Sequence, residues 1–203
     1  MPSMSSSSLS VETVHGTAVL PYLEAVARLR IAVFRDWPYL YDGDADYERG
    51  YLAAYADSPD SVFVLARDGE QIVGASTGLP LVDDDEAFQQ PFRAAGIAPA
   101  SVFYFGESVL LPAYRGHGLG HAFFDRREAH AQALGRFECT AFCAVERAAD
   151  DPRRPADARS NEAFWRKRGY APQPQMQVHL RWAELQHGEI AHRLQVWTRA
   201  LPR

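Results

Sequence analysis

Residues 101–134 constrain the fold of this chain most, because a strand pattern, a glycine-rich turn and a helix pattern follow one another there without a gap. Apolar and aromatic residues occupy both alternating faces of residues 102–111, which predicts a central strand covered on both sides. Pro112 ends this strand, and apolar residues recur at helical spacing from Leu119 onward. The turn between the two elements therefore opens a helix.

The turn at residues 115–120 contains Gly116, Gly118 and Gly120. Glycines allow consecutive backbone N–H groups to point toward one site, and the dipole of the following helix adds partial positive charge there, so the geometry suits a phosphate group. A Walker loop is excluded because no Gly-Lys-Ser or Gly-Lys-Thr ends the turn. The dinucleotide pattern also fails, because His121 stands where its third glycine is required.

The spacing that fits is R-x-x-G-x-G, formed by Arg115, Gly118 and Gly120. It resembles the signature of the GCN5-related N-acetyltransferase (GNAT) family, in which the amides of this loop hold the pyrophosphate of acetyl-coenzyme A. A second likeness lies at residues 164–170, Phe-Trp-Arg-Lys-Arg-Gly-Tyr, which is similar to the Phe-Tyr-x-x-x-Gly-Phe segment of that family. With the order of the predicted elements, the resemblance spans residues 11–199.

The other patterns predict elements along the whole chain. They indicate a strand at 11–17, helices at 21–34 and 47–57, a hairpin of strands 61–66 and 71–79, a strand at 138–145, a short helix at 161–168 that Gly169 ends, and an antiparallel pair at 176–182 and 192–199. Residues 80–100 predict a long irregular connection, of the length typical of a lid or a functional loop. Its acidic run, residues 83–86, predicts a solvated surface that would also attract an amine.

These patterns predict an α/β protein, and the family resemblance implies the GNAT-like acyl-CoA N-acyltransferase fold. On that resemblance we expect a central mixed, mostly antiparallel sheet with one splayed parallel strand pair, flanked by helices. The parallel pair is strand 102–111 and strand 138–145, joined by a crossover helix, and the resemblance implies that the pantetheine arm lies between them. We expect a single N-acetyltransferase domain at residues 11–203, preceded by a disordered Ser-rich tail at residues 1–10.

Composition limits the partners. The formal net charge of −5 argues against nucleic acid as a partner, and no apolar stretch reaches the length of a membrane span or forms a signal peptide. Cys139 and Cys143 are four residues apart in a strand, about 13 Å, which is too far for a disulfide. Free thiols fit a cytoplasmic location. The oligomeric state stays open, with a homodimer among the alternatives.

Glu107 is the candidate general base. An alkyl amine has a pKa near 10.4 and arrives protonated, so a base must take its proton. Glu107 lies mid-strand among Phe105, Val109 and Leu111, where burial would raise the pKa of its carboxyl toward a useful range. The alternative is a structural carboxylate that pairs with a buried arginine such as Arg126, or one that faces solvent.

The family resemblance also implies cofactor contacts. It places the thioester carbonyl against a backbone N–H among Val109, Leu110 and Leu111, where the developing oxyanion would be stabilised. It assigns the pyrophosphate to residues of the turn, namely Arg115, Gly116, His117, Gly118, Leu119 and Gly120, although Arg115 is equally consistent with an ordinary surface residue.

Trp165 stands where the family often has a tyrosine that protonates the departing thiolate, and it is assigned to the cofactor site. A thiol with a pKa near 8.5 can leave with little help. Tyr104, Tyr114 and Tyr170 are alternative donors, and each also suits a packing role.

We therefore expect an acetyl-CoA-dependent N-acetyltransferase that moves the acetyl group directly to a primary amine, of a small molecule or a peptide, in a ternary complex. The alternative is a non-catalytic acyl-CoA binding or sensing module, which Trp165 keeps open. No metal is expected, because His117 and His121 lack the glutamate of an H-E-x-x-H motif. Residues 106–110 lack the second glycine of a nucleophile elbow.

Overall fold

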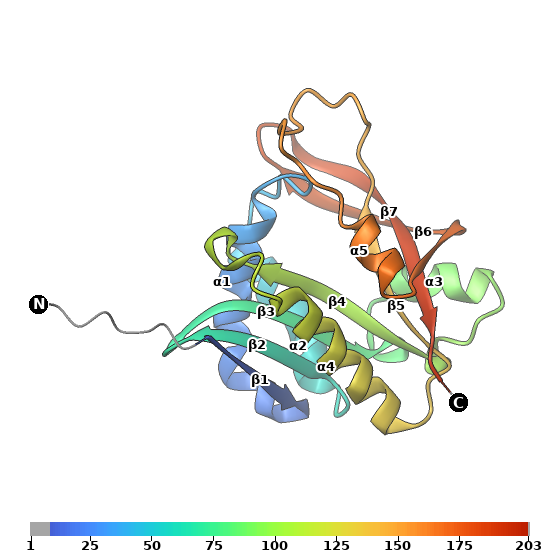
Figure 1. Ribbon diagram of the computed structural model, residues 1–203. Coiled ribbons are helices and arrows are strands. Elements are labelled where there is room, and N and C mark those ends of the chain that lie inside the picture. Colours follow the sequence, from blue (N-terminus) through green and yellow to red (C-terminus); the bar gives the residue numbers. More distant parts are fainter. Residues whose placement is uncertain (1–8, 203) are drawn as a thin grey trace, which may run out of the picture.

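The computed structural model describes residues 9–202. The predicted tail at residues 1–10 therefore lies mostly outside the described residues, and its last two members, Leu9 and Ser10, belong to the first strand. The described strands are β1 (Leu9–His15), β2 (Val62–Asp68), β3 (Gln71–Pro80), β4 (Val102–Leu110), β5 (Cys139–Val145), β6 (Ala171–Glu184) and β7 (Gly188–Ala200). The α-helices are α1 (Leu23–Phe34), α2 (Ala45–Asp57), α3 (Glu86–Ala94), α4 (Leu119–Leu134) and α5 (Glu162–Lys167) (Figure 1).

The strands form one seven-stranded sheet in the order β1-β2-β3-β4-β5-β7-β6. Every neighbouring pair is antiparallel except β4 and β5, which are parallel. This pair is joined only where Val102–Tyr104 meets Cys139–Ala141, and beyond those residues β4 and β5 diverge. The predicted mixed sheet with one splayed parallel pair is confirmed.

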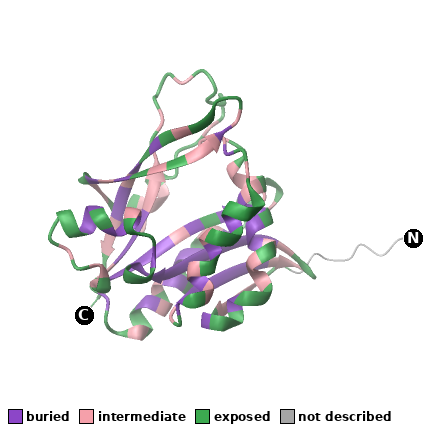
Figure 2. Ribbon diagram, turned by 180° about the vertical axis from the view of Figure 1, so that it is seen from behind, coloured by how far each residue is buried: buried purple, intermediate pink, exposed green. Residues whose placement is uncertain are grey.

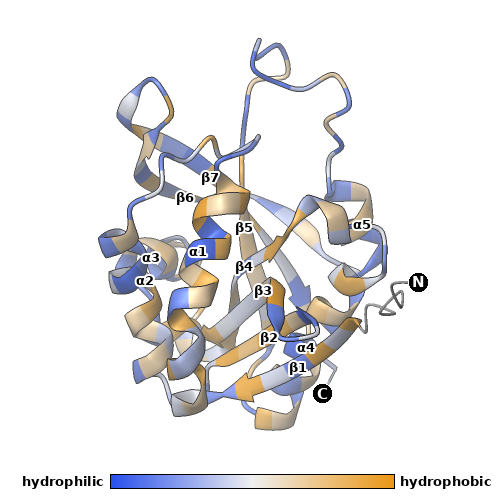
Figure 3. Cartoon of the chain, turned by 90° about the vertical axis from the view of Figure 1, so that its left-hand side faces the viewer, coloured by the Kyte–Doolittle hydropathy of each residue, from blue (hydrophilic) through white to orange (hydrophobic). Residues whose placement is uncertain are grey.

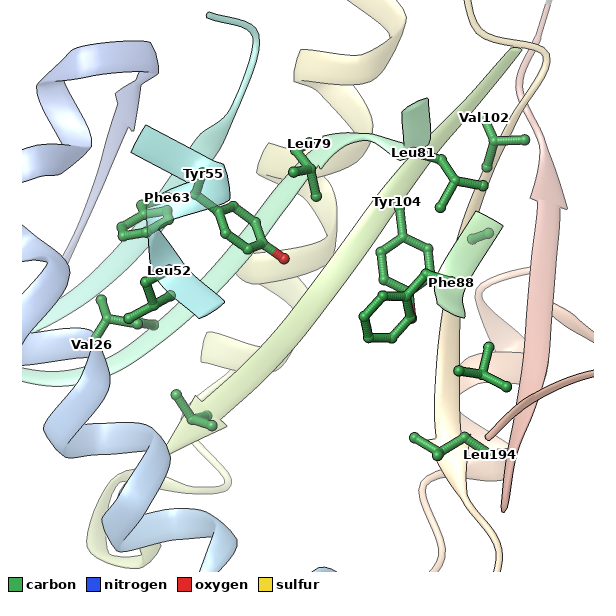
Figure 4. Close-up of a cluster of buried hydrophobic side chains, with 14 of the residues drawn as sticks. Val26, Leu52, Tyr55, Phe63, Leu79, Leu81, Phe88, Val102, Tyr104 and Leu194 are labelled. Carbon is green, nitrogen blue, oxygen red and sulfur yellow. The ribbon is translucent and has the colours of Figure 1, made fainter. Parts of the chain in front are cut away.

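Helices cover both faces of the sheet, with α1 and α2 on one face and α4 on the other (Figure 1). Each face has its own core. Leu52 and Tyr55 of α2 pack with Tyr104 of β4 on the first face, whereas Phe123 and Phe124 of α4 pack with strand residues on the second. Figure 4 shows part of the first core, and Figure 2 shows that the central strands are the most continuously buried part of the chain.

Most predicted elements are present with small changes at their ends, because their signals are local. The β2–β3 turn has Gly69 at a φ of +58° and Gly169 follows α5 at +88°, both of which favour glycine. The final pair is longer than predicted, and Val178 of β6 faces Leu194 of β7. In Figure 3 hydrophobic colour follows the central strands, whereas the connection between β5 and α5 is largely hydrophilic.

The prediction of an irregular connection at residues 80–100 was wrong. The segment contains α3, whose N-terminus is capped by the Asp85 carboxylate accepting from the Ala87 N–H, together with two short 3-10 turns. Phe88 and Phe92, one helical turn apart, are buried against the sheet. The helical period was hidden because Pro91 lies inside the helix. Within residues 9–202, the helices are all too short or too polar to cross a bilayer.

Candidate active site

The divergence of β4 and β5 ends at the glycine-rich turn. Gly116 and Gly118 have φ values of +83° and +80°, and a side chain at either position would meet open space, so backbone conformation is what requires glycine. Gly118 caps α4. In the part of the chain that the structure describes, no backbone hydrogen bond uses the amides of residues 116–120. These free amides at a helix N-terminus form the arrangement that binds phosphate.

The side chains around this turn have partners of their own. Arg115 donates from Nε to the Leu110 carbonyl oxygen at 3.3 Å, and Nδ1 of His117 lies 3.2 Å from the Tyr114 carbonyl oxygen. Leu119, the first residue of α4, is buried in the core on that face of the sheet. The His121 ring packs edge-to-face on Phe164 of α5, with ring centroids 4.8 Å apart. The turn is therefore fixed from both sides while its amides stay open.

A β-bulge breaks β4 at Gly106 and Glu107. Gly78 of β3 faces Phe105 and Ser76 faces Ser108, so only one residue of β3 lies opposite these two. Before the bulge, Phe105 packs on the α4 face. The extra residue shifts the alternation by one position, so Glu107 points to the face covered by α1 and α2.

The Glu107 carboxylate belongs to a buried cluster of charges. Arg30 of α1 donates from Nη1 to Oε2 of Glu107 at 2.7 Å and from Nε to Oε2 of Glu48, a residue of α2. The Tyr51 hydroxyl also donates to Oε2 of Glu107, at 3.2 Å. Within the described residues, Oε1 of Glu107 and Oε1 of Glu48 are buried without a hydrogen-bond partner. The structural partner proposed for Glu107, Arg126, is exposed on α4, and Arg30 takes that place.

Glu48 is a further candidate site residue that the sequence did not reveal: it lines the neighbouring pocket and pairs with Arg30. It is fully buried, and burial raises the pKa of its carboxyl, against the opposing effect of Arg30. Glu48, Tyr51 and Tyr55 lie on one face of α2 at helical spacing, and that spacing was the available signal.

Gly106 lets helix α2 approach the bulge. A Cβ at this position would overlap the Tyr55 hydroxyl and lie 2.7 Å from Oγ1 of Thr77. The Tyr55 hydroxyl is 3.3 Å from that of Tyr51, which contacts Glu107. Gly106 therefore makes room for the tyrosines that position the carboxylate.

Arg127 holds the bulge from the opposite face. It lies on α4, is 1% exposed, and donates to the carbonyl oxygens of Thr77 and Glu107, each at 3.1 Å, and to Oγ of Ser108 at 2.8 Å. Its guanidinium lies 4.2 Å from the ring centroid of Phe105. Burial lowers the pKa of Arg127 to about 10. The acceptors that the bulge exposes are therefore satisfied by a buried cation.

The backbone amides of β4 differ in direction. The Leu111 N–H donates to the Val73 carbonyl oxygen at 3.0 Å, so it is occupied within the sheet. Val109, two residues earlier, faces the same way, because alternate residues of an antiparallel strand share a direction. Leu110 lies between them, and its N–H points across the divergence toward β5.

Asp84 corrects the prediction that the acidic run 83–86 is solvated. Its side chain is buried, with Oδ1 accepting from the Asp85 N–H at 2.8 Å and Oδ2 without a hydrogen-bond partner among the described residues. Burial raises the pKa of the Asp84 carboxyl to about 7, and the charges of Asp85 and Glu107 add to the effect.

The aromatic candidates for a proton donor occupy different places. The Tyr104 hydroxyl lies 2.9 Å from Sγ of Cys143, across the divergence on the face of α1 and α2. Tyr170 bonds Thr140 and Glu128 on the α4 face, and Tyr114 donates to Asp68 at 2.9 Å. Trp165 packs on Phe142 with centroids 5.0 Å apart. Of these three candidate tyrosines, Tyr104 is the one that contacts, among the described residues, a side chain lining the neighbouring pocket, that of Cys143.

That pocket lies between strands β4, β5, β6 and β7 and helices α1, α2 and α3, and its lining includes Arg30, Glu48, Tyr51, Gly106 and Cys143. The structure thus places two candidate features at the divergence of β4 and β5. Glu107 lies on one side of this divergence, in the cluster with Arg30 and Glu48, and the turn at residues 115–120 lies at its open end. Among residues 9–202, no group of three or more His, Cys, Asp or Glu side chains is arranged to hold a metal ion.

Comparison with known proteins identifies this architecture. The model of the acetyltransferase (GNAT) family matches residues 26–170. The chain belongs to the GNAT family of acetyltransferases. No curated protein matches it in sequence.

Similar solved structures share the fold at low identity. An N-acetyltransferase from Staphylococcus aureus is 10% identical with a TM-score of 0.61, covering 97% of this chain and 100% of its own. The yncA protein of Salmonella typhimurium, solved with its cofactor acetyl-CoA, is 10% identical with a TM-score of 0.57, covering 96% and 95%. NAA60 of Arabidopsis thaliana, in complex with a bisubstrate analogue, is 10% identical with a TM-score of 0.57, covering 95% and 100%.

Proposed function

We propose that this protein is an acetyl-CoA-dependent N-acetyltransferase that transfers the acetyl group directly to a primary amine in a ternary complex. The observation that carries the proposal is a single arrangement. Free amides lie at the open end of the β4–β5 divergence, and a buried carboxylate cluster lies beside the bulge of β4. The fold shared with yncA, whose structure contains acetyl-CoA, supports the choice of donor.

In this proposal the turn at residues 115–120 binds the pyrophosphate through its amides and the helix dipole. Trp165 and the diverging strands border the pantetheine arm. The Leu110 N–H donates to the thioester carbonyl oxygen and stabilises the negative charge that develops there. When bound, acetyl-CoA supplies the activated acyl group, and the protein orients it toward the pocket.

Glu107 takes a proton from the ammonium group of the acceptor, and the neutral amine that results attacks the thioester carbonyl carbon and displaces the coenzyme A thiolate. Its Oε2 is occupied by Arg30 and Tyr51, which fixes the carboxylate and leaves Oε1 to accept the proton. Tyr104 is the candidate donor to the departing thiolate. The NAA60 complex with a bisubstrate analogue supports transfer with both substrates present together.

The cysteines favour direct transfer over a covalent acetyl-enzyme. Burial raises the pKa of Cys143 to about 12 and that of Cys139 to about 11. Both therefore stay protonated near neutral pH, and a thiol is a poor nucleophile compared with its thiolate.

The test is amine-dependent release of free thiol from acetyl-CoA, measured for the wild type, Glu107→Gln and the control Glu138→Gln at an exposed glutamate. Removing a general base costs about 10²–10⁴-fold in rate, so Glu107→Gln is expected to lose at least 100-fold in kcat while acetyl-CoA affinity persists. An unchanged kcat would exclude Glu107 as the base. Tight acetyl-CoA binding without turnover on any amine would favour the sensing module.

A further inference from the structure

The pocket beside the carboxylate cluster has mostly aromatic walls, provided by Phe34, Tyr39, Tyr41, Tyr47, Phe88 and Trp182. The rings pack on one another: Tyr39 lies 4.3 Å from Phe34 and 5.7 Å from Trp182, measured between centroids. Apolar walls with a few polar groups on one side are typical of sites for small molecules. The aromatic faces also carry negative electrostatic potential, which attracts a cation.

A negative cluster lies at one side of the pocket: Arg30 and Glu48 line the pocket, and Glu107 is bonded to Arg30. The Arg30 guanidinium lies between the Glu48 and Glu107 carboxylates, so when all three groups are ionised the cluster has a net charge of −1. The positive charge of Arg30 is already compensated by these two carboxylates, so the cluster has no excess positive charge to attract an anionic ligand. Glu48 lines the pocket, and its fully buried Oε1 has no hydrogen-bond partner among residues 9–202. A buried, unpartnered carboxylate oxygen is best satisfied by a cationic donor.

The rim of the pocket is closed on one side by bonds between two segments. The connection from α1 to α2 meets the end of the β6–β7 hairpin, where Asp42 N–H donates to the Ala183 carbonyl oxygen and Leu185 N–H donates to that of Leu40, both at 2.8 Å. Nε1 of Trp182 donates to the Tyr39 carbonyl oxygen at 3.1 Å. An extended peptide cannot cross this rim without breaking these bonds.

We propose that the acceptor is a small primary amine with a hydrophobic, preferably aromatic, body and no carboxylate. Its ammonium group lies toward Glu48 and Glu107, and its body lies among the aromatic walls. The proposal rests on the proposed function and narrows its acceptor. It separates this class from three others that an amine acetyltransferase could use: amino acids, polyamines and peptides.

The first test compares acceptors that differ in one feature. Phenethylamine, phenylalanine, spermidine and a tripeptide with N-terminal phenylalanine are assayed by thiol release from acetyl-CoA. We expect kcat/KM for phenethylamine to exceed each of the others at least tenfold. The negative cluster repels the carboxylate of phenylalanine, the aromatic walls favour a ring over a polyamine chain, and the bonds on the closed side of the rim hinder an extended peptide. An equal or higher value for phenylalanine, spermidine or the tripeptide would overturn the proposal.

The second test does not require turnover, so it separates failure of the acceptor class from failure of the proposed activity. Calorimetry measures binding of phenethyltrimethylammonium, which cannot be acetylated, and of 3-phenylpropionate. We expect the cation to bind at least tenfold more tightly than the anion. Tyr47→Ala is expected to weaken cation binding at least threefold, whereas Val82→Ala, a control outside the pocket with the same 49% exposure, leaves it unchanged. Equal affinity for the two probes, or equal effects of the two variants, would refute the assignment.

Discussion

Burial of Asp84 predicts an unusual dependence of stability on pH. Burial raises the pKa of this carboxyl from 3.8 to about 7. Between these two values the folded protein holds a proton that the unfolded chain has lost, so the free energy of unfolding falls as pH rises. Each pH unit in that window is worth about 1.4 kcal/mol, which gives about 4 kcal/mol across it. Above pH 7 the full cost of the buried carboxylate is present.

Asp84→Asn removes the titration and keeps the local geometry. The amide oxygen can still accept from the Asp85 N–H, which lies 2.8 Å from Oδ1, but the side chain cannot ionise. The variant is therefore expected to gain stability relative to the wild type as pH rises, by up to about 4 kcal/mol at pH 8 compared with pH 4.

Urea unfolding of both proteins at pH 4 to 8 measures this difference. Asp57→Asn, at an exposed aspartate, reports the effect of losing a carboxyl elsewhere in the chain. The difference in unfolding free energy between the wild type and Asp84→Asn could instead stay constant with pH or change with the opposite sign. Either result would show that the Asp84 carboxyl does not have the raised pKa on which the prediction rests.

Two further variants test the turn and the bulge. Gly118→Glu places a carboxylate at the free amides, and we expect it to weaken coenzyme A binding at least tenfold, as measured by calorimetry. Gly96→Glu is the control, because Gly96 has a similar φ (+76° against +80°) and the substitution carries the same strain of about 1–2 kcal/mol. This control is expected to leave coenzyme A binding intact. Arg127→Met leaves the carbonyls of the bulge unsatisfied and is expected to cost about 2–5 kcal/mol in unfolding free energy. Arg126→Met, at the exposed neighbouring position, should cost under about 0.5 kcal/mol, and similar losses for the two would contradict the role of Arg127.

The fold and the glycine-rich turn at residues 115–120 were predictable because their signals are local. A strand, a proline, spaced glycines and a helical period lie within residues 101–134, and the parallel pair follows from their order. Helix α3 was missed because Pro91 obscured a period that depends on Phe88 and Phe92. The burial of the Asp84 side chain was missed for the same reason, because it depends on how the neighbouring helix α3 packs.

The surroundings of Glu107 could not be predicted from alternation. Strict alternation groups Glu107 with Phe105, yet these side chains lie on opposite faces because the bulge adds one residue to β4. The partners are also distant in sequence: Arg30 is 77 positions away and Tyr51 is 56. Such contacts depend on the packing of helices across a sheet, which no local pattern encodes.

The bulge explains why two buried arginines lie so close to one residue. Its side chain and its carbonyl point to opposite faces of the sheet, and both must be satisfied away from water. Arg30 binds the Glu107 carboxylate from α1, and Arg127 binds the Glu107 carbonyl oxygen from α4. Arg30 is compensated by carboxylates, whereas Arg127 has no carboxylate within ion-pair distance in the described chain and lies over the ring of Phe105 instead. Because both contacts act on the same residue, the orientation of the candidate base is fixed before any substrate binds, which is the preorganisation that catalysis by a positioned carboxylate requires.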